Sequence, residues 1–248
     1  MRHPHKWEEM LPEEFFEEFE RFPIAYWACG AMEDHGLQNA LAADPYIAYE
    51  ICLRAVKTTG GILFPIVPFA PAGYPGYSRK ELRSKEKQLY YPSLWVSREI
   101  CKDLYIEIME SMADMGFKSC VGFCGHWPGD MLLQEITKEK DGRIGDMRFW
   151  GGGTSVLQDV WAEEDKKNPG ISGHGTMDET STLMAVREDW VDLSRVKRIN
   201  ESPIASQVKG IPQIKLDKIM LANTGFGNRM LNIAAERIAN RAKEMLDT

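Results

Sequence analysis

The sequence predicts an α/β domain with a largely parallel central sheet. Short apolar runs alternate with longer amphipathic stretches in the order strand, helix, strand, helix, strand, which is typical of parallel sheets. With 248 residues, of which 44% are hydrophobic, the chain can build one sizeable core, so a single domain over residues 1–248 is expected. Histidines and carboxylates follow two of the apolar runs directly, at the strand ends where such sheets place their sites.

The first predicted elements are a helix over residues 12–22 and a buried strand over residues 24–29. The helical stretch is acidic, and its phenylalanines recur at helical spacing after Pro12, a residue suited to a first helical turn. The strand is a short apolar run that stops at Gly30.

A second helix is predicted to begin with Asp44 as its N-cap and Pro45 as its first helical residue, and to end at Gly60-Gly61. Residues 62–67 then form an apolar run typical of a strand. Because Pro65 cannot donate a backbone hydrogen bond, this strand is expected at a sheet edge or to end there.

The polar and aromatic stretch 71–94 is too irregular for a core element and is long enough for a lid or a subunit contact; the sequence does not decide between the two. Apolar residues from 100 to 115 predict a helix that Ser97 caps and Gly116 ends. A strand over residues 120–124 follows, with Gly125-His126 at its carboxyl end, and then a further helix.

Three features complete the order of elements. The run Gly151-Gly152-Gly153 is expected to form a turn. Thr176 and Glu179 fit a capping box that opens an apolar helix. The last amphipathic helix is predicted over residues 228–246.

Composition narrows the classes of partner. A formal net charge of −7 argues against non-specific binding to nucleic acid or to anionic membranes, which would be repelled. The chain has no secretory h-region and no long apolar run, and its five cysteines lack CxxC spacing, which fits buried reduced thiols. A cytoplasmic protein with a small-molecule substrate is therefore expected.

The histidines beyond residue 5 predict a metal centre. There are three, and each lies among acidic residues or glycines in a short polar segment: His35 with Glu33 and Asp44, His126 after Gly125, and His174 ahead of Asp178-Glu179. Imidazole and carboxylate are the ligands of hydrolytic Zn²⁺, Mn²⁺ or Fe²⁺ centres. Because Glu33 and His35 are two residues apart, their side chains leave the same face of an extended backbone.

Each residue also has a simpler interpretation. Glu33 and His35 could form an exposed acidic turn, and His126 could be a hydrogen-bonded loop histidine. Asp44 and Glu179 could be helix caps. A catalytic thiol at Cys29 or Cys124 is disfavoured, because no activating pattern accompanies either cysteine.

As an ordered set, these segments resemble the creatininase (creatinine amidohydrolase) family. The matching residues are Gly30-Ala31-Met32-Glu33-Asp34-His35-Gly36, then Asp44 nine residues after His35, then Cys124-Gly125-His126, and finally His174 through Glu179-Thr180-Ser181. The match spans roughly residues 24 to 190, and the set is far more specific than any single piece.

The resemblance implies a three-layer α/β/α fold and two divalent metal ions per subunit. Glu33, His35, Asp44 and His126 would be ligands, with Asp44 bridging, and His174 would shuttle a proton. Glu179 stands where many members have a further acidic ligand and is taken here as a ligand and catalytic residue. Pro128 occupies the position of the acid in creatininase itself, so the alternatives are Asp130 or no further acid. The family is commonly hexameric, so a homo-oligomer is expected.

Departures from the family pattern concern the substrate. Leu37-Gln38-Asn39-Ala40 replaces the usual Pro-His-Leu-Pro, Cys124 replaces an asparagine, and Trp127-Pro128-Gly129-Asp130 replaces the frequent Gly-Gly-Asn. Specificity for creatinine is therefore not expected.

The leading functional hypothesis is hydrolysis of a C–N bond in a small cyclic or formyl amide by a metal-activated water. His174 would carry a proton to the leaving group. One alternative is a hydrolase with the same metal ligands that cleaves a C–C bond, as in a related hydrolase that opens a cyclic diketone derived from inositol. Another is a family member that binds a ligand without turnover.

Overall fold

Five strands form one sheet in the part of the chain that the computed structural model describes, residues 3–71, 93–94, 96–201 and 213–247. The strand order is β2-β1-β3-β5-β4, and every pairing is parallel except the short hairpin of β4 and β5. The strands are β1 (Ile24–Cys29), β2 (Ile62–Leu63), β3 (Ser119–Cys124), β4 (Arg143–Ile144) and β5 (Met147–Gly153).

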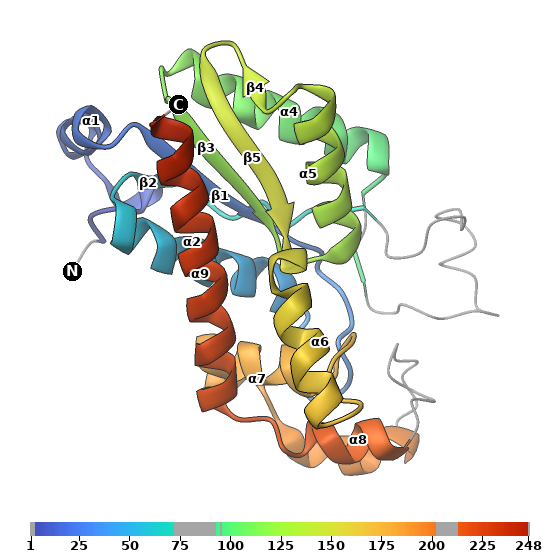
Figure 1. Ribbon diagram of the computed structural model, residues 1–248. Helices are drawn as coiled ribbons and strands as arrows, with labels where there is room; N and C mark the ends of the chain where they lie inside the picture. Colours follow the sequence, from blue (N-terminus) through green and yellow to red (C-terminus); the bar gives the residue numbers. More distant parts are fainter. Residues whose placement is uncertain (1–2, 72–92, 95, 202–212, 248) are drawn as a thin grey trace.

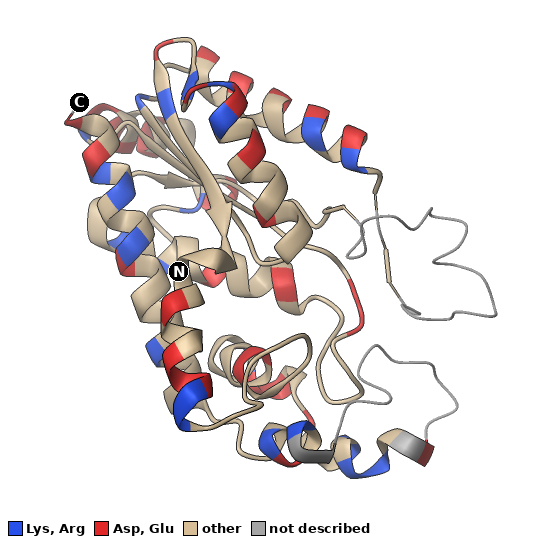
Figure 2. Cartoon of the chain, turned by 45° about the vertical axis from the view of Figure 1, so that its right-hand side comes forward, with Lys and Arg blue, Asp and Glu red and all other residues tan. Residues whose placement is uncertain are grey.

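Helices cover both faces of this sheet (Figure 1). They are α1 (Pro12–Arg21), α2 (Ala43–Thr59), α4 (Arg98–Asp114), α5 (Trp127–Glu139), α6 (Gln158–Lys167), α7 (Met177–Val186), α8 (Gln213–Ile219) and α9 (Thr224–Leu246). The described residues also form four 3₁₀ helices: η1 (Trp7–Glu9), which precedes α1, and η2 (Thr154–Leu157), η3 (Glu188–Trp190) and η4 (Leu193–Glu201), which lie between α-helices. Figure 2 shows positive and negative residues interspersed along the outer helices.

The alternation of side chains along β1 explains why the sheet has a helical layer on each face. Tyr26 and Ala28 join a core that is completed by α2, α7 and α9, whereas Trp27 and Cys29 join a second core completed by α1, α4 and α5. All six residues of β1 are buried, because successive side chains of a strand point to opposite faces and both faces are covered. The predicted three-layer α/β/α sandwich with a largely parallel sheet is confirmed.

Several local predictions are also confirmed. Helix α1 begins at Pro12, and the Ser97 hydroxyl accepts a hydrogen bond from Ile100 N–H at the start of α4. Gly116 follows α4 with a φ of +96°, a left-handed value that favours glycine. Strand β2 lies at a sheet edge, as Pro65 indicated, although it is only two residues long. All five cysteines are buried free thiols.

Three predictions of local structure are wrong. Asp44 is not the N-cap of α2, because the helix begins at Ala43 and Ala42 precedes it; the Asp44 carboxylate meets imidazoles instead. The Gly151–Gly153 run is not a turn but the end of β5, where Gly153 pairs with Cys124 of β3. An added Cβ on Gly153 would lie 2.1 Å from Cys124 O, so this close strand contact requires glycine.

The capping box predicted at α7 does not form. The Thr176 hydroxyl donates to Gly173 O, and Glu179 accepts a hydrogen bond from Gly175 N–H rather than from Thr176. Helix α9 begins at Thr224, four residues earlier than predicted, because Asn223 caps it by accepting from Phe226 N–H.

Most of the stretch proposed as a lid or subunit contact, residues 72–92, lies outside the described residues. Within the described part of the chain, no helix combines the length and apolar character needed to cross a membrane.

Candidate metal centre

The candidate centre lies at the carboxyl ends of β1 and β3. The loop after β1 carries Glu33 and His35, His126 follows β3, and Asp44 lies in the first turn of α2. All four residues are at most 5% exposed. The interpretation of Glu33 and His35 as an exposed turn is therefore wrong.

Gly125 explains how the Asp44 backbone comes so close to the end of β3. A Cβ added at Gly125 would lie 2.1 Å from Asp44 O, and one added at Gly30 would lie 2.5 Å from Pro45 N. The two glycines that follow β1 and β3 therefore let the start of α2 pack directly on the strand ends. This packing presents the Asp44 carboxylate between the two loops.

Asp44 contacts a histidine with each of its oxygens. Its Oδ1 lies 2.9 Å from His35 Nε2, and its Oδ2 lies 3.0 Å from His126 Nδ1. His126 Nδ1 also lies 2.9 Å from Glu33 Oε1, and His35 Nε2 lies 3.7 Å from Glu179 Oε2. Three long-separated segments of the chain therefore meet around one carboxylate.

Backbone carbonyls orient both imidazoles. His126 Nε2 donates to Pro71 O at 3.1 Å, and His35 Nδ1 donates to Glu33 O at 3.2 Å. Each ring thus turns its other nitrogen toward the carboxylates. This is the usual arrangement of a metal-binding histidine, whose second nitrogen is fixed by an outer hydrogen bond.

The charges stabilise one another without any cation. Burial lowers the pKa of His35, but Asp44 and Glu179 outweigh burial and hold the pKa well above its usual 6.5. His126 behaves in the same way, with Glu33 and Asp44 raising its pKa. Burial raises the pKa of Asp44, but the two imidazoles outweigh it and hold that pKa below its usual range. A cation binding here would have to displace the protons from both rings.

The donor set could hold a cation in more than one place. Glu33, Asp44 and His126 offer ligand atoms within 4.8 Å of one another, and so do His35, Asp44 and Glu179. We call these the first and second clusters; Glu33, His35 and His174 form a third group with the same spacing. Asp44 belongs to both, and its Oδ2 accepts no hydrogen bond of good geometry from the described residues although it is buried. His126 Nδ1 lies 3.0 Å from this oxygen but is poorly aligned for a hydrogen bond, and a cation would satisfy the oxygen better.

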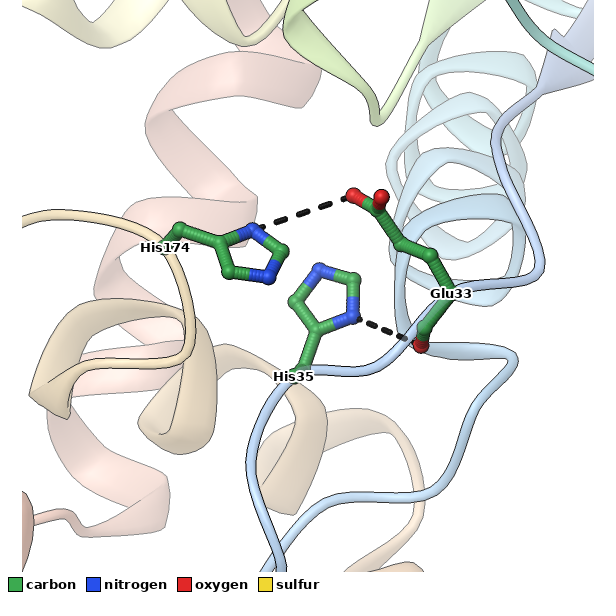
Figure 3. Close-up of side chains that lie close together, drawn as sticks. All are labelled: Glu33, His35 and His174. Carbon is green, nitrogen blue, oxygen red and sulfur yellow. Dashed lines mark hydrogen bonds and ion pairs between the residues drawn. The ribbon is translucent and has the colours of Figure 1, made fainter. Parts of the chain in front are cut away.

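His174 lies on the loop before α7. Figure 3 shows its ring beside His35 and Glu33, one residue from each cluster. Its ring centroid is 4.4 Å from that of His35, and its Nδ1 is 3.7 Å from Glu33 Oε1. Its Nε2 donates to Asp34 O at 2.6 Å, so in the neutral ring the proton resides on Nε2 and Nδ1 is the free base. One third of the His174 side chain is exposed, which leaves it accessible to a substrate.

A cleft of about 380 Å³ opens onto these residues. Besides Glu33, Asp44, His126, His174 and Glu179, it is lined by Gly125, Trp127, Pro128, Thr154, Trp161, Ser172, Gly173 and Asp178. The cleft therefore combines an acidic and imidazole floor with two indole side chains.

Comparison with known proteins places the chain in a family. A family model described as Creatininase, creatinine amidohydrolase, matches residues 8–238, nearly the whole chain. The chain belongs to the creatininase family. This membership and the two clusters together support a metal-dependent amidohydrolase.

Solved creatininase structures share the fold. A crystal structure of creatinine amidohydrolase matches with a TM-score of 0.70 at 18% identity, covering 95% of each chain. A putative creatinine amidohydrolase from Bacteroides fragilis NCTC 9343 matches with a TM-score of 0.68 at 17% identity, covering 99% of this chain and 97% of the other. No curated protein matches the chain at a significant level.

Within this creatininase-family chain, Glu179 rather than Asp130 reaches the centre. Asp130 accepts hydrogen bonds from Ser155 N–H at 2.8 Å and from Gln134 Nε2 at 2.7 Å, and it belongs to neither cluster. Glu179 lies in the second cluster although Gly175 N–H also contacts it. Pro128 lines the cleft, as its position beside His126 requires.

One contact of the centre was not expected from the sequence: the backbone carbonyl of Asp34 holds His174. Because the contact uses a backbone oxygen across 140 residues, it does not depend on the side chain at position 34, and the sequence gives no signal of it. Asp178, which the sequence groups with His174 and Glu179, lines the cleft, and burial together with the neighbouring Glu179 raises its pKa to about 7.

Proposed function

We propose that this chain is a metal-dependent hydrolase that cleaves a C–N bond of a small cyclic or formyl amide. The observation that carries the proposal is the shared Asp44, which joins the first and second clusters at the floor of one cleft that also contains His174. Two cations bridged by a carboxylate beside a proton-transfer group are the parts of a hydrolytic centre.

The ligand roles follow from the clusters. Glu33, Asp44 and His126 would hold one ion, and His35, Asp44 and Glu179 would hold the other. When bound, divalent ions supply polarisation of a substrate carbonyl and a more acidic water. Solved relatives include a creatininase described as Zn–Zn type and another described as a manganese form. Zn²⁺ and Mn²⁺ are therefore the leading candidates here, and Fe²⁺ suits the same ligands.

His174 is proposed as the proton-transfer residue. Its Nδ1 faces the centre while Asp34 O holds its Nε2–H, so the ring can accept a proton on Nδ1 and pass it to a leaving nitrogen without losing its orientation. Its position 3.7 Å from Glu33 Oε1 gives the resulting imidazolium a nearby negative partner.

The cleft walls suggest a flat, uncharged substrate. Trp127 is about half exposed (49%) beside His126, and Trp161 lines the same cleft, so both indoles can pack on a ring and exclude water. Among the described residues that line the cleft there is no Lys or Arg to pair with a phosphate or carboxylate. Assembly as a homo-oligomeric hexamer stays a prediction of the family resemblance, and a cytoplasmic location stays a prediction from the sequence pattern.

The test is metal analysis of freshly purified protein followed by a substrate panel. We expect about two divalent ions per chain, and turnover of at least one cyclic or formyl amide that chelation abolishes and Zn²⁺ or Mn²⁺ restores. If the protein turned over only oxidised cyclitols, the reaction would be C–C bond cleavage at the same metal centre. Full metal content with no turnover of any amide or ketone would favour a ligand-binding protein instead.

A further inference from the structure

Two buried amide side chains, Gln38 and Asn39, connect the His35 loop to the start of α7. Gln38 Nε2 donates to His35 O at 3.2 Å and to Gly175 O at 2.8 Å. Asn39 Nδ2 donates to His35 O and to Thr180 Oγ1, both at 3.0 Å. The side chains of Gln38, Asn39 and Thr180 are 2%, 7% and 0% exposed. The same two amides therefore hold the backbone of His35 and the segment that carries Glu179.

The donors of the two amides fix their orientation. The NH₂ groups of Gln38 and Asn39 face carbonyl and hydroxyl oxygens, which accept hydrogen bonds. Gln38 Oε1 and Asn39 Oδ1 are buried and accept no hydrogen bond from the described residues. Removing the NH₂ groups would leave the carbonyls of His35 and Gly175 without these donors.

The hydrogen bonds continue from these amides to the second cluster. Gln38 binds Gly175 O, and Gly175 N–H in turn donates to Glu179 Oε2 at 2.5 Å. On the other side, both amides fix the carbonyl of His35, whose Nε2 lies 3.7 Å from the same Glu179 oxygen. The separation of these two proposed ligands thus depends on the amide pair.

The first cluster is held by other contacts. Glu33 N–H donates to Leu41 O at 2.9 Å, and His126 Nε2 donates to Pro71 O at 3.1 Å. Asp44, common to both clusters, is set by the packing of α2 on Gly125. Loss of the amide contacts should therefore disturb one cluster more than the other.

We propose that Gln38 and Asn39 are positioning residues for the second cation site, formed by His35, Asp44 and Glu179. They lock the His35 loop onto α7 and so fix the distance between two ligands that are remote in sequence. This inference rests on the proposed function, because it requires that the clusters bind cations. It also gives a role to the Leu37-Gln38-Asn39-Ala40 segment, which departs from the family pattern.

The test is a titration of the metal-free, full-length chain with Mn²⁺. The wild type should bind two ions and give the electron paramagnetic resonance spectrum of a coupled pair. Gln38→Met keeps the side-chain length and removes the donor. We expect it to retain one ion at wild-type affinity, to bind the other about 10- to 100-fold more weakly, and to show an uncoupled spectrum at one equivalent. Thr180→Val should act in the same direction, whereas Thr180→Ser, which keeps the hydroxyl, should bind both ions normally.

Gln134→Met is the matched control. Like Gln38, Gln134 uses its Nε2 as a hydrogen-bond donor, here to the buried carboxylate oxygen Asp130 Oδ1, but it lies in α5 and belongs to neither cluster. This variant should bind two ions with wild-type affinity. If Gln38→Met did not fold, the Thr180→Val and Thr180→Ser pair would decide, since each differs from threonine in one group: valine replaces the hydroxyl with a methyl, and serine keeps the hydroxyl and loses the methyl.

The outcomes separate this inference from the proposed function. The positioning role would be overturned if Gln38→Met and Thr180→Val both bound two Mn²⁺ ions with wild-type affinity, or if these variants weakened both sites equally. Either result would leave the hydrolase proposal intact. A wild-type chain that binds no Mn²⁺ and no Zn²⁺ would overturn both proposals, and it would do so before any variant was made.

Discussion

Asp44 and Asp130 are two buried aspartates in similar places with different surroundings. Both lie in the first turn of a helix, in α2 and α5, where the positive end of the helix dipole favours a carboxylate. Both are at most 3% exposed, and each packs against a glycine at a strand end, Gly125 for Asp44 and Gly153 for Asp130. Only Asp44 belongs to the candidate metal centre.

The two aspartates differ in the groups that their carboxylates contact. Asp130 receives two neutral N–H donors, and burial still raises its pKa. Asp44 faces two imidazoles, which hold its pKa down in spite of burial, and its Oδ2 lacks a well-aligned donor. Burial at a helix start therefore does not by itself create a metal site. A site needs neighbours that are ligands themselves and that leave carboxylate oxygens unsatisfied.

The largest expected effect that tests this comparison is that of Asp44→Asn. A neutral amide cannot bridge two cations, and it leaves two imidazoles without their partner. We expect loss of bound metal from both clusters and a fall in activity of about 10³-fold or more. Metal analysis and steady-state rates of the purified variant are the measurements. Normal metal content in Asp44→Asn would reduce Asp44 to a structural residue like Asp130.

His174→Ala separates proton transfer from metal binding. His174 Nδ1 faces Glu33 but its ring is fixed from outside the clusters by Asp34 O. We therefore expect near-normal metal content with a fall in kcat of about 10²-fold or more. Wild-type turnover with metal bound would remove His174 from the mechanism.

Asp130→Asn should affect stability and not the centre. One of its two hydrogen bonds becomes a contact between two donors, at Ser155 N–H or at Gln134 Nε2, so the free energy of unfolding should fall by about 1–3 kcal/mol. Metal content should equal that of the wild type, and Glu179→Gln should lower it. The reverse pattern in metal analysis would make Asp130 the further acidic ligand.

The smallest effect is a pH dependence of the same variant. Because burial raises the pKa of Asp130 above 3.8, the folded chain binds this proton more tightly than the unfolded chain. Its contribution to stability is therefore greatest at low pH and declines as the pH rises from 3.8 through the raised pKa. Thermal unfolding of metal-free wild type and Asp130→Asn across this window should show a wild-type advantage that shrinks with rising pH. A constant difference would contradict the assigned pKa direction.

The sequence by itself determined the order of helices and strands and the strand ends at which the candidate site residues lie. The apolar run of β1 and the glycines at 30 and 125 reflect local physics: which residues fit a strand buried on both faces, and where a backbone must approach another closely. The same local patterns predict that Glu33, His35 and His126 follow the ends of strands. The family resemblance then supplied the grouping of these residues with His174.

Only the tertiary structure decided which residues meet. Local patterns assigned Asp44 and Glu179 equally well to helix caps, and neither assignment describes their contacts in the folded chain. The choice of Glu179 over Asp130, the nitrogen that each imidazole turns inward, and the amide pair Gln38 and Asn39 all depend on distances between loops. Those distances are fixed by how α2 and α7 pack on the sheet, and packing between remote segments is not encoded in the spacing of neighbouring residues.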